Sequence, residues 1–179
     1  MKRIVLAFLL ALALPALAQQ HGSWTVESHP KTKIAQLNNP TESLGLGLLT
    51  ENNRREDKKI DLTVEFVCLN DGEEFRWEAP LVNPAGKTMA QAGIELTLTF
   101  DSDAPIVERW QGRGDTALKS YHPSQKMTAT EFLDKLRKAK KLTVGYTLKT
   151  GKREVTTFDL TGTNDLMAEL CGGEGCNLQ

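Results

Sequence analysis

The sequence predicts a mainly β, α+β fold: an antiparallel β-sandwich or partly open barrel of about eight or nine strands, with one packed helix and a short C-terminal helix. Three observations predict it. Apolar residues alternate with polar residues along most of the chain, which is typical of half-buried strands. Asn, Asp and Gly residues separate these segments at short intervals. One segment alone, residues 128–140, has clear helical spacing instead.

The strongest strand pattern covers residues 60–68, in which Ile60, Leu62, Val64, Phe66 and Cys68 share one face. A turn at residues 70–72 and a second alternating run at 75–79 predict a hairpin. Residues 94–100 form another strand, and residues 142–148 and 155–160 form a pair around a Gly turn. Weaker strands are expected at Trp24–Ser28, 34–37, 44–50, 106–111 and 117–121.

The helical segment begins at a capping box. Thr128 can accept the backbone N–H of Glu131, and the Glu131 side chain can reach back to the cap. Phe132, Leu133, Leu136 and Ala139 then recur at helical spacing. A short second helix is expected at residues 165–171, where Gly172 acts as a stop signal.

The first residues predict export. A basic start, an apolar run over residues 4–14 and an Ala16-Leu17-Ala18 end are typical of a cleavable signal peptide. We therefore expect a signal peptide at residues 1–18, one β-rich domain at residues 19–171 and a flexible Gly-rich tail at residues 172–179. The mature protein is expected in the periplasm or secreted, with no membrane contact after cleavage.

Composition excludes some functional classes. The formal net charge is −1, without the basic excess of a nucleic-acid-binding protein. His21, His29 and His122 lie in predicted loops or at the new terminus, and no G-x-S-x-G elbow occurs. Asp101 and Asp103 lack the frame of a calcium loop and favour a turn before Pro105. We expect no catalytic site, no metal and no cofactor.

Three cysteines, Cys68, Cys171 and Cys176, occur in a chain expected in an oxidising compartment. A Cys68–Cys171 bond would close a long loop and use a cysteine on the predicted core face. A Cys171–Cys176 bond would close a small Gly-rich loop instead. In the first case Cys176 is a free thiol or joins two chains in a dimer. A thiol-active pair, Cys171 and Cys176, is a further hypothesis.

Two surface regions are candidates for protein contact. Arg109 and Trp110 precede a Gly-rich turn, and an exposed Trp beside Arg is typical of an interface anchor; core packing of Trp110 is the alternative. Trp77 is expected in the core because of its alternation. The charged residues 51–59 predict a solvated hairpin tip, and in an inhibitor of a secreted hydrolase this loop would enter the enzyme's cleft.

The order of several segments resembles a known family. A strand ending in Phe100-Asp101 is followed by Glu108-Arg109-Trp110, then by the helix, and the chain closes with residues 157–162 and Cys171. This order is similar to the periplasmic proteins associated with type VI secretion and to related small exported proteins. The resemblance implies a bond from the mid-chain Cys to the terminal Cys. It also implies a non-enzymatic accessory role, in which the partner is another envelope protein or a cell-wall component.

Overall fold

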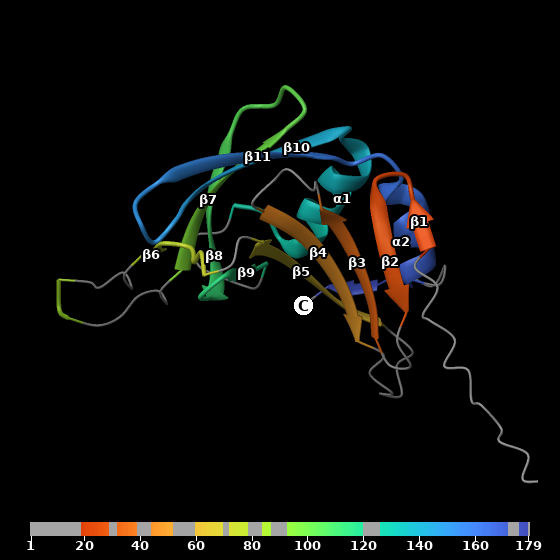
Figure 1. The fold of residues 1–179 in the computed structure, drawn as a ribbon, viewed down its shortest axis with the longest axis horizontal. Coiled ribbons are helices and arrows are strands. Elements are labelled where there is room, and N and C mark those ends of the chain that lie inside the picture. The colour runs from red at the N-terminus through yellow and green to blue at the C-terminus, as the bar shows by residue number, and fades with distance from the viewer. Residues whose placement is uncertain are drawn as a thin grey trace, which may run out of the picture.

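The computed structural model describes residues 19–28, 32–38, 44–51, 60–69, 72–78, 84–86, 93–119, 126–171 and 176–178. These residues form two helices and one open sheet of twelve strands (Figure 1). No helix in this part of the chain is long and apolar enough to cross a bilayer. The predicted signal peptide and the charged loop at residues 52–59 lie outside the described residues.

The sheet has the strand order β1-β2-β3-β4-β5-β9-β8-β7-β10-β11, with β12 beside β5 and β6 beside β7. All pairs are antiparallel except β12 with β5, which is parallel. The predicted mainly β, antiparallel fold with two helices is confirmed. The strands are β1 (Gln19–His21), β2 (Trp24–Ser28), β3 (Thr32–Asn38), β4 (Leu44–Glu51), β5 (Ile60–Cys68), β6 (Trp77–Glu78), β7 (Gly93–Phe100), β8 (Ile106–Arg113), β9 (Thr116–Leu118), β10 (Lys141–Thr147), β11 (Arg153–Asp159) and β12 (Cys176–Leu178).

The long strands follow the predicted alternation. In β5 the side chains of Leu62, Val64, Phe66 and Cys68 are buried, and β7 and β10 bury every second residue in the same way. Burial of one face of a strand fixes its register, because a shift of one residue would turn every apolar side chain to water.

The two helices begin and end close to their predicted bounds. Helix α1 (Ala129–Lys138) has the predicted capping box: Glu131 N donates to Thr128 Oγ1 at 3.2 Å, and Thr128 N donates to Glu131 Oε2 at 2.7 Å. Its apolar face buries Phe132, Leu133 and Leu136. Helix α2 (Thr163–Cys171) follows β11 directly.

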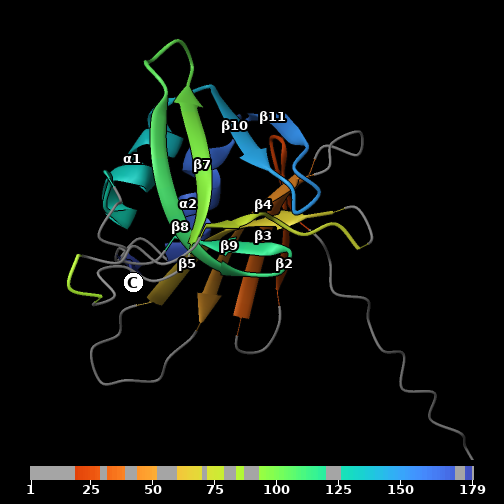
Figure 2. The same ribbon diagram turned by 90° about the vertical axis from the view of Figure 1, so that its left-hand side faces the viewer.

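The sheet curls so that its two halves face each other (Figure 2). Aromatic side chains fill the space between them. Phe66 of β5 lies between Trp110 of β8 and Phe158 of β11, with ring centroids 4.9 and 5.9 Å away. Phe132 of α1 packs edge-on against Trp110 at 5.2 Å. The core therefore joins strands from both halves of the sheet to the helix.

A seam joins the β1–β2 turn to the segment that links β11 with α2. Ser23 N donates to Thr161 O at 3.1 Å, and Trp24 Nε1 donates to Thr163 Oγ1 at 3.0 Å. Gly22 and Gly162 both have positive φ, and a Cβ on either would lie 2.2–2.3 Å from a backbone oxygen across the seam. Only glycine fits this close approach.

Three predictions about the fold are wrong. Residues 75–79 do not form a hairpin with β5, because β6 pairs with β7 and Phe75 bridges to Leu148. Trp77 is 38% exposed rather than buried. The predicted flexible tail contains β12, which pairs with residues 60–62 of β5.

Candidate binding surfaces

The predicted contact pair at Arg109 and Trp110 is not an exposed patch. Trp110 is fully buried, so the alternative of core packing is confirmed and the role of Trp110 as an interface anchor is wrong. Arg109 lies on the opposite face of β8, where its Nη2 is 4.0 Å from Glu78 Oε2. Its Nη1 is buried and has no hydrogen-bond partner. Consecutive residues of a strand point to opposite faces, so a single surface cannot present both side chains.

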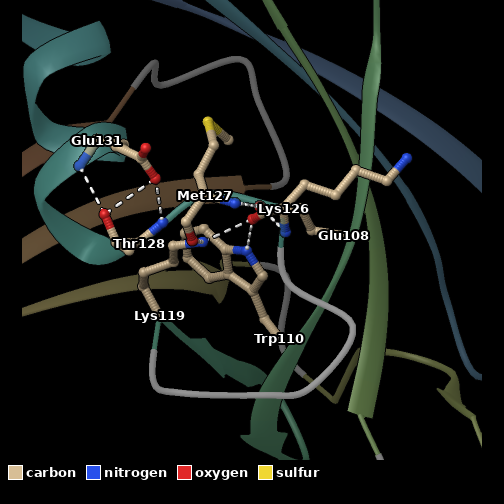
Figure 3. Close-up of polar contacts among 7 residues, drawn as sticks. All are labelled: Glu108, Trp110, Lys119, Lys126, Met127, Thr128 and Glu131. Carbon is tan, nitrogen blue, oxygen red and sulfur yellow. Dashed lines mark hydrogen bonds and ion pairs between the residues drawn. The ribbon is translucent and has the colours of Figure 1, made fainter.

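Trp110 belongs to a buried polar network centred on the Glu108 carboxylate (Figure 3). One oxygen of Glu108, Oε2, accepts from Lys119 Nζ at 2.7 Å and from Trp110 Nε1 at 2.9 Å. The other, Oε1, accepts from the backbone N–H groups of Lys126 and Met127 at 2.9 and 2.6 Å. Lys119 Nζ also donates to Met127 O at 2.7 Å.

This network fixes the approach to α1. Glu108 and Lys119 are almost fully buried, at 1% and 2% exposure. Burial lowers the pKa of Lys119, and the hydrogen bond to Glu108 opposes that shift. The ammonium also lies 5.3 Å from the centroid of the Trp110 ring, which suits a cation–π contact. Because each charge has several partners, the network holds residues 126 and 127 against β8 and the end of β9.

The sequence contained one signal of this network. Glu108 shares its strand face with Ile106 and Trp110, so a charge occupies a position that the alternation assigns to the core. Such a residue needs a buried partner of opposite charge. Sequence alone does not indicate which of 22 Lys and Arg residues provides it.

The cysteines do not form the Cys68–Cys171 bond that the resemblance implies. Cys68 is a free, buried thiol, whereas Cys171 is disulfide-bonded. The predicted Cys68–Cys171 bond is therefore wrong. The side chain of Cys176 lies outside the described side chains.

Cys68 lines an open hollow of about 370 Å³ beside Leu69, Glu73, Glu74 and Asp115. Burial, followed by the negative charges of Glu73 and Asp115, raises the pKa of the Cys68 thiol to about 12. The thiolate is the nucleophilic form of cysteine, so this environment makes Cys68 unreactive. Among the described residues, no group of three or more His, Cys, Asp or Glu side chains is placed to hold a metal ion.

The acidic turn after β7 has a structural role. The Asp101 carboxylate accepts the backbone N–H groups of Lys140 and Lys141, both at 2.9 Å. Asp103 pairs with Lys135 of α1 at 3.1 Å. Asp101 therefore joins the end of β7 to the start of β10, and Asp103 joins it to α1. His21 likewise bonds to Glu169 of α2 within the seam, while His29 and His122 lie outside the described residues.

Among the described residues, no strand lies beside the outer edge of β11. Leu148 N bonds to Lys152 O and Leu160 N bonds to Lys140 O, so the even-numbered residues of β11 turn their backbone groups toward β10. The N–H and C=O groups of Arg153, Val155 and Thr157 therefore point away from the sheet. No described strand pairs with this side of β11. At its far end the edge is bounded by the seam, because Ser23 Oγ bonds to Asp159 Oδ2 at 3.1 Å.

Val155 is the most exposed large apolar residue of the described chain, at 66%. It borders a shallow hollow of about 220 Å³ over Gly145, which pairs with Val155 on one side and Thr97 on the other. The hollow exists because Gly145 has no side chain to fill the face between its neighbours. An exposed apolar residue, a hollow and unpaired backbone groups thus lie together at one edge.

Comparison with protein-family models, with curated protein sequences and with solved structures finds no match to this chain.

Proposed function

We propose that this chain is an exported, non-enzymatic binding protein of the cell envelope that contacts another envelope protein through the free edge of β11. The observation that carries the proposal is the edge itself, which presents the backbone groups of Arg153, Val155 and Thr157 with no described strand beside them. An unpaired edge is a template for an added strand, and backbone hydrogen bonds then supply affinity.

The surroundings of the edge define the partner. The seam at Asp159 and the turn before Arg153 limit the added strand to about five or six residues, which is an ordinary strand length. On the exposed face, a partner side chain opposite Val155 would cover that residue and reach toward the hollow over Gly145. A short extended segment with an apolar or aromatic residue at that position fits best.

The N-terminal sequence supports export of the chain, as does the resemblance to periplasmic proteins associated with type VI secretion. Under this proposal the mature protein is periplasmic or secreted, and the partner is an envelope protein rather than a nucleic acid or a lipid bilayer. A cell-wall component as ligand, and inhibition of a secreted hydrolase, are outcomes that the experiment below distinguishes.

The test places a photo-crosslinking amino acid at position 155 and identifies what is captured in the envelope of the producing cell. The candidate partner is then measured against purified wild type, Val155→Pro and Val155→Thr. Proline removes the outward N–H that an added strand needs, and no bond to β10 is lost. Threonine keeps that N–H and the β-branched shape.

We expect Val155→Pro to weaken binding at least tenfold and Val155→Thr to change it less than threefold, with the circular dichroism spectrum unchanged in both. If all three proteins bind equally and the proline variant is folded, the partner does not bind at the β11 edge and the proposal is wrong on this point. If the captured ligand is a glycan, the partner class is wrong. If it is a hydrolase that loses activity on binding, the inhibitor hypothesis replaces the accessory role.

We also propose that Cys171 pairs with Cys176, because Cys171 is disulfide-bonded while Cys68 is free. This pairing would place a covalent link between the end of α2 and the start of β12. A non-reducing peptide map of the exported protein should recover a peptide pair that joins these two cysteines. Recovery of an alkylated Cys176 would contradict this pairing.

A further inference from the structure

The second edge of β5 is divided between two short strands. On its first side β5 pairs with β4 over eight residues. On its second side β9 pairs antiparallel with residues 65–67, and β12 pairs parallel with residues 60–62. Parallel pairing is slightly less stable per residue than antiparallel pairing, and β12 has only three residues.

The hydrogen bonds of β5 show which backbone groups face β12. Lys119 N donates to Val64 O, and Cys68 N donates to Asp115 O, both at 2.8 Å. The even-numbered residues of β5 therefore face this side, and those opposite β12 are Ile60 and Leu62. Asn177 lies in register with Asp61, between them. In a parallel ladder the residue so placed uses both its N–H and its C=O.

The site of β12 is a slot that is closed at one end. β12 runs from Ile60 toward Leu62, and directly ahead of it Lys119 N occupies the carbonyl of Val64. A strand that enters here must stop or turn away after Leu62. Without a strand in the slot, the backbone groups of Leu62 would lose their partner beside a side chain that is 1% exposed. An unpaired buried backbone group is costly, so the slot favours occupation.

We propose that this slot is an exchange site that takes β12 of a second copy of this chain in place of its own. The identical strand makes the identical ladder, so exchange costs no pairing. In the chain's own slot, β12 is favoured by an effective concentration of roughly millimolar. The disulfide at Cys171, at the base of the segment that leads to β12, adds to this preference. The exchange uses a different edge from the β11 contact proposed above and does not depend on it.

The test compares oxidised wild type with the double variant Cys171→Ser and Cys176→Ser by light scattering across concentrations up to about 1 mM, the range of the effective concentration. We expect the oxidised wild type to stay monomeric. Opening the link should strengthen dimerisation by about tenfold or more, so that the dimer fraction of the double variant rises with concentration.

Two proline variants in the double-serine background locate the contact. Asn177→Pro removes the one N–H of β12 that the ladder uses, and we expect it to abolish the dimer. Leu178→Pro is the matched control, because the N–H of residue 178 points away from β5; this variant should still dimerise. Val155→Pro in the same background should also dimerise, which separates this slot from the β11 edge.

If the double variant stays monomeric up to about 1 mM, the proposal is overturned. This holds whether β12 of the same chain or a strand of another protein occupies the slot. A dimer that survives Asn177→Pro, or that is lost with Val155→Pro, overturns it as well. A native-like circular dichroism spectrum and a cooperative urea transition establish that each variant is folded.

Discussion

The buried ionisable residues of this protein are accommodated in two different ways. Lys119 and Glu108 are ionisable and almost fully buried, yet each has several polar partners. Cys68 is buried as a neutral thiol, and nearby carboxylates oppose its ionisation. Each environment predicts a measurable response to substitution or to pH.

Removal of the Lys119 ammonium should destabilise the fold strongly. In Lys119→Met the Glu108 carboxylate would stay buried with its cationic partner gone, and loss of one member of a buried pair costs about 3–5 kcal/mol. Urea unfolding of the purified variant measures this change. Lys126→Met is the matched control, since residue 126 reaches Glu108 through its backbone N–H alone; we expect a change under about 0.5 kcal/mol. Equal effects in the two variants would show that the ion pair contributes nothing specific.

The Cys68 thiol should resist alkylation in the native protein and react on unfolding. Its folded pKa of about 12 lies above the reference value of 9.0, so the folded state keeps a proton that the unfolded state loses between these values. Stability should therefore fall as pH rises from about 9 toward 12. Cys68→Ala should show a shallower decline over this range in urea unfolding at stepped pH. Rapid native reaction with a thiol reagent near pH 8 would contradict the prediction.

At this scale the sequence misleads where a polar residue occupies a core position. The hypothesis of an exposed Trp110 followed from its neighbour Arg109 and the Gly-rich turn, yet Trp110 is buried together with Glu108. Trp77 fails in the opposite way, because β6 has two residues and its alternation extends no further. Residue patterns report the average environment of a face, whereas individual burial depends on the strands and helices packed against it.

Secondary-structure elements are better encoded than residue environments. The alternation in β5, β7, β10 and β11 and the capping box of α1 are local signals, and each predicted the element that is observed. The short strands β1 and β12 were not predicted, because three residues carry no measurable period. The pairing of β6 with β7 also depends on contacts between distant segments, which no local pattern reports.

The capping box gives a prediction at this scale. Thr128→Ala would remove the side-chain acceptor for Glu131 N and leave that N–H without its cap. The expected loss is about 1 kcal/mol of unfolding free energy, measured by urea denaturation. Thr130→Ala lies in the same first turn on an exposed position and should change stability by less than half as much. A larger loss at Thr130 than at Thr128 would contradict the capping role.

The whole molecule is an open sheet that is held nearly closed at one seam. The strand order brings β5, β8 and β11 around a single aromatic core, but the two ends of the sheet meet through turns rather than through a strand ladder. In the part of the chain that the structure describes, this arrangement leaves the outer edge of β11 without a neighbouring strand while the core stays covered. The order of the strands was not predictable from the sequence, because many pairings satisfy the same alternation.

Alanine substitution of two glycines with nearly the same positive φ tests how much the close approach at the seam contributes to stability. Gly162→Ala would place a Cβ 2.2 Å from His21 O at a position with φ +89°. Gly151→Ala has a similar φ of +88° with no atom within 4 Å, so it reports the backbone strain alone. We expect Gly151→Ala to cost about 1–2 kcal/mol and Gly162→Ala to cost at least about 2 kcal/mol more, measured by thermal unfolding. Equal losses would show that the seam can open without penalty.

The seam also sets the order in which the chain can fold. Trp24 reaches its hydrogen-bond partner Thr163 across 139 positions of sequence, so the first strands cannot complete their contacts until α2 has emerged. Contacts of such long range slow folding, because a large loop must close before they form. Under the export proposed above, this delay would keep the chain open on the side of the membrane where it is made. Closure of the sheet requires both of its ends, and the second end, β10 and β11, lies far later in the sequence than the first.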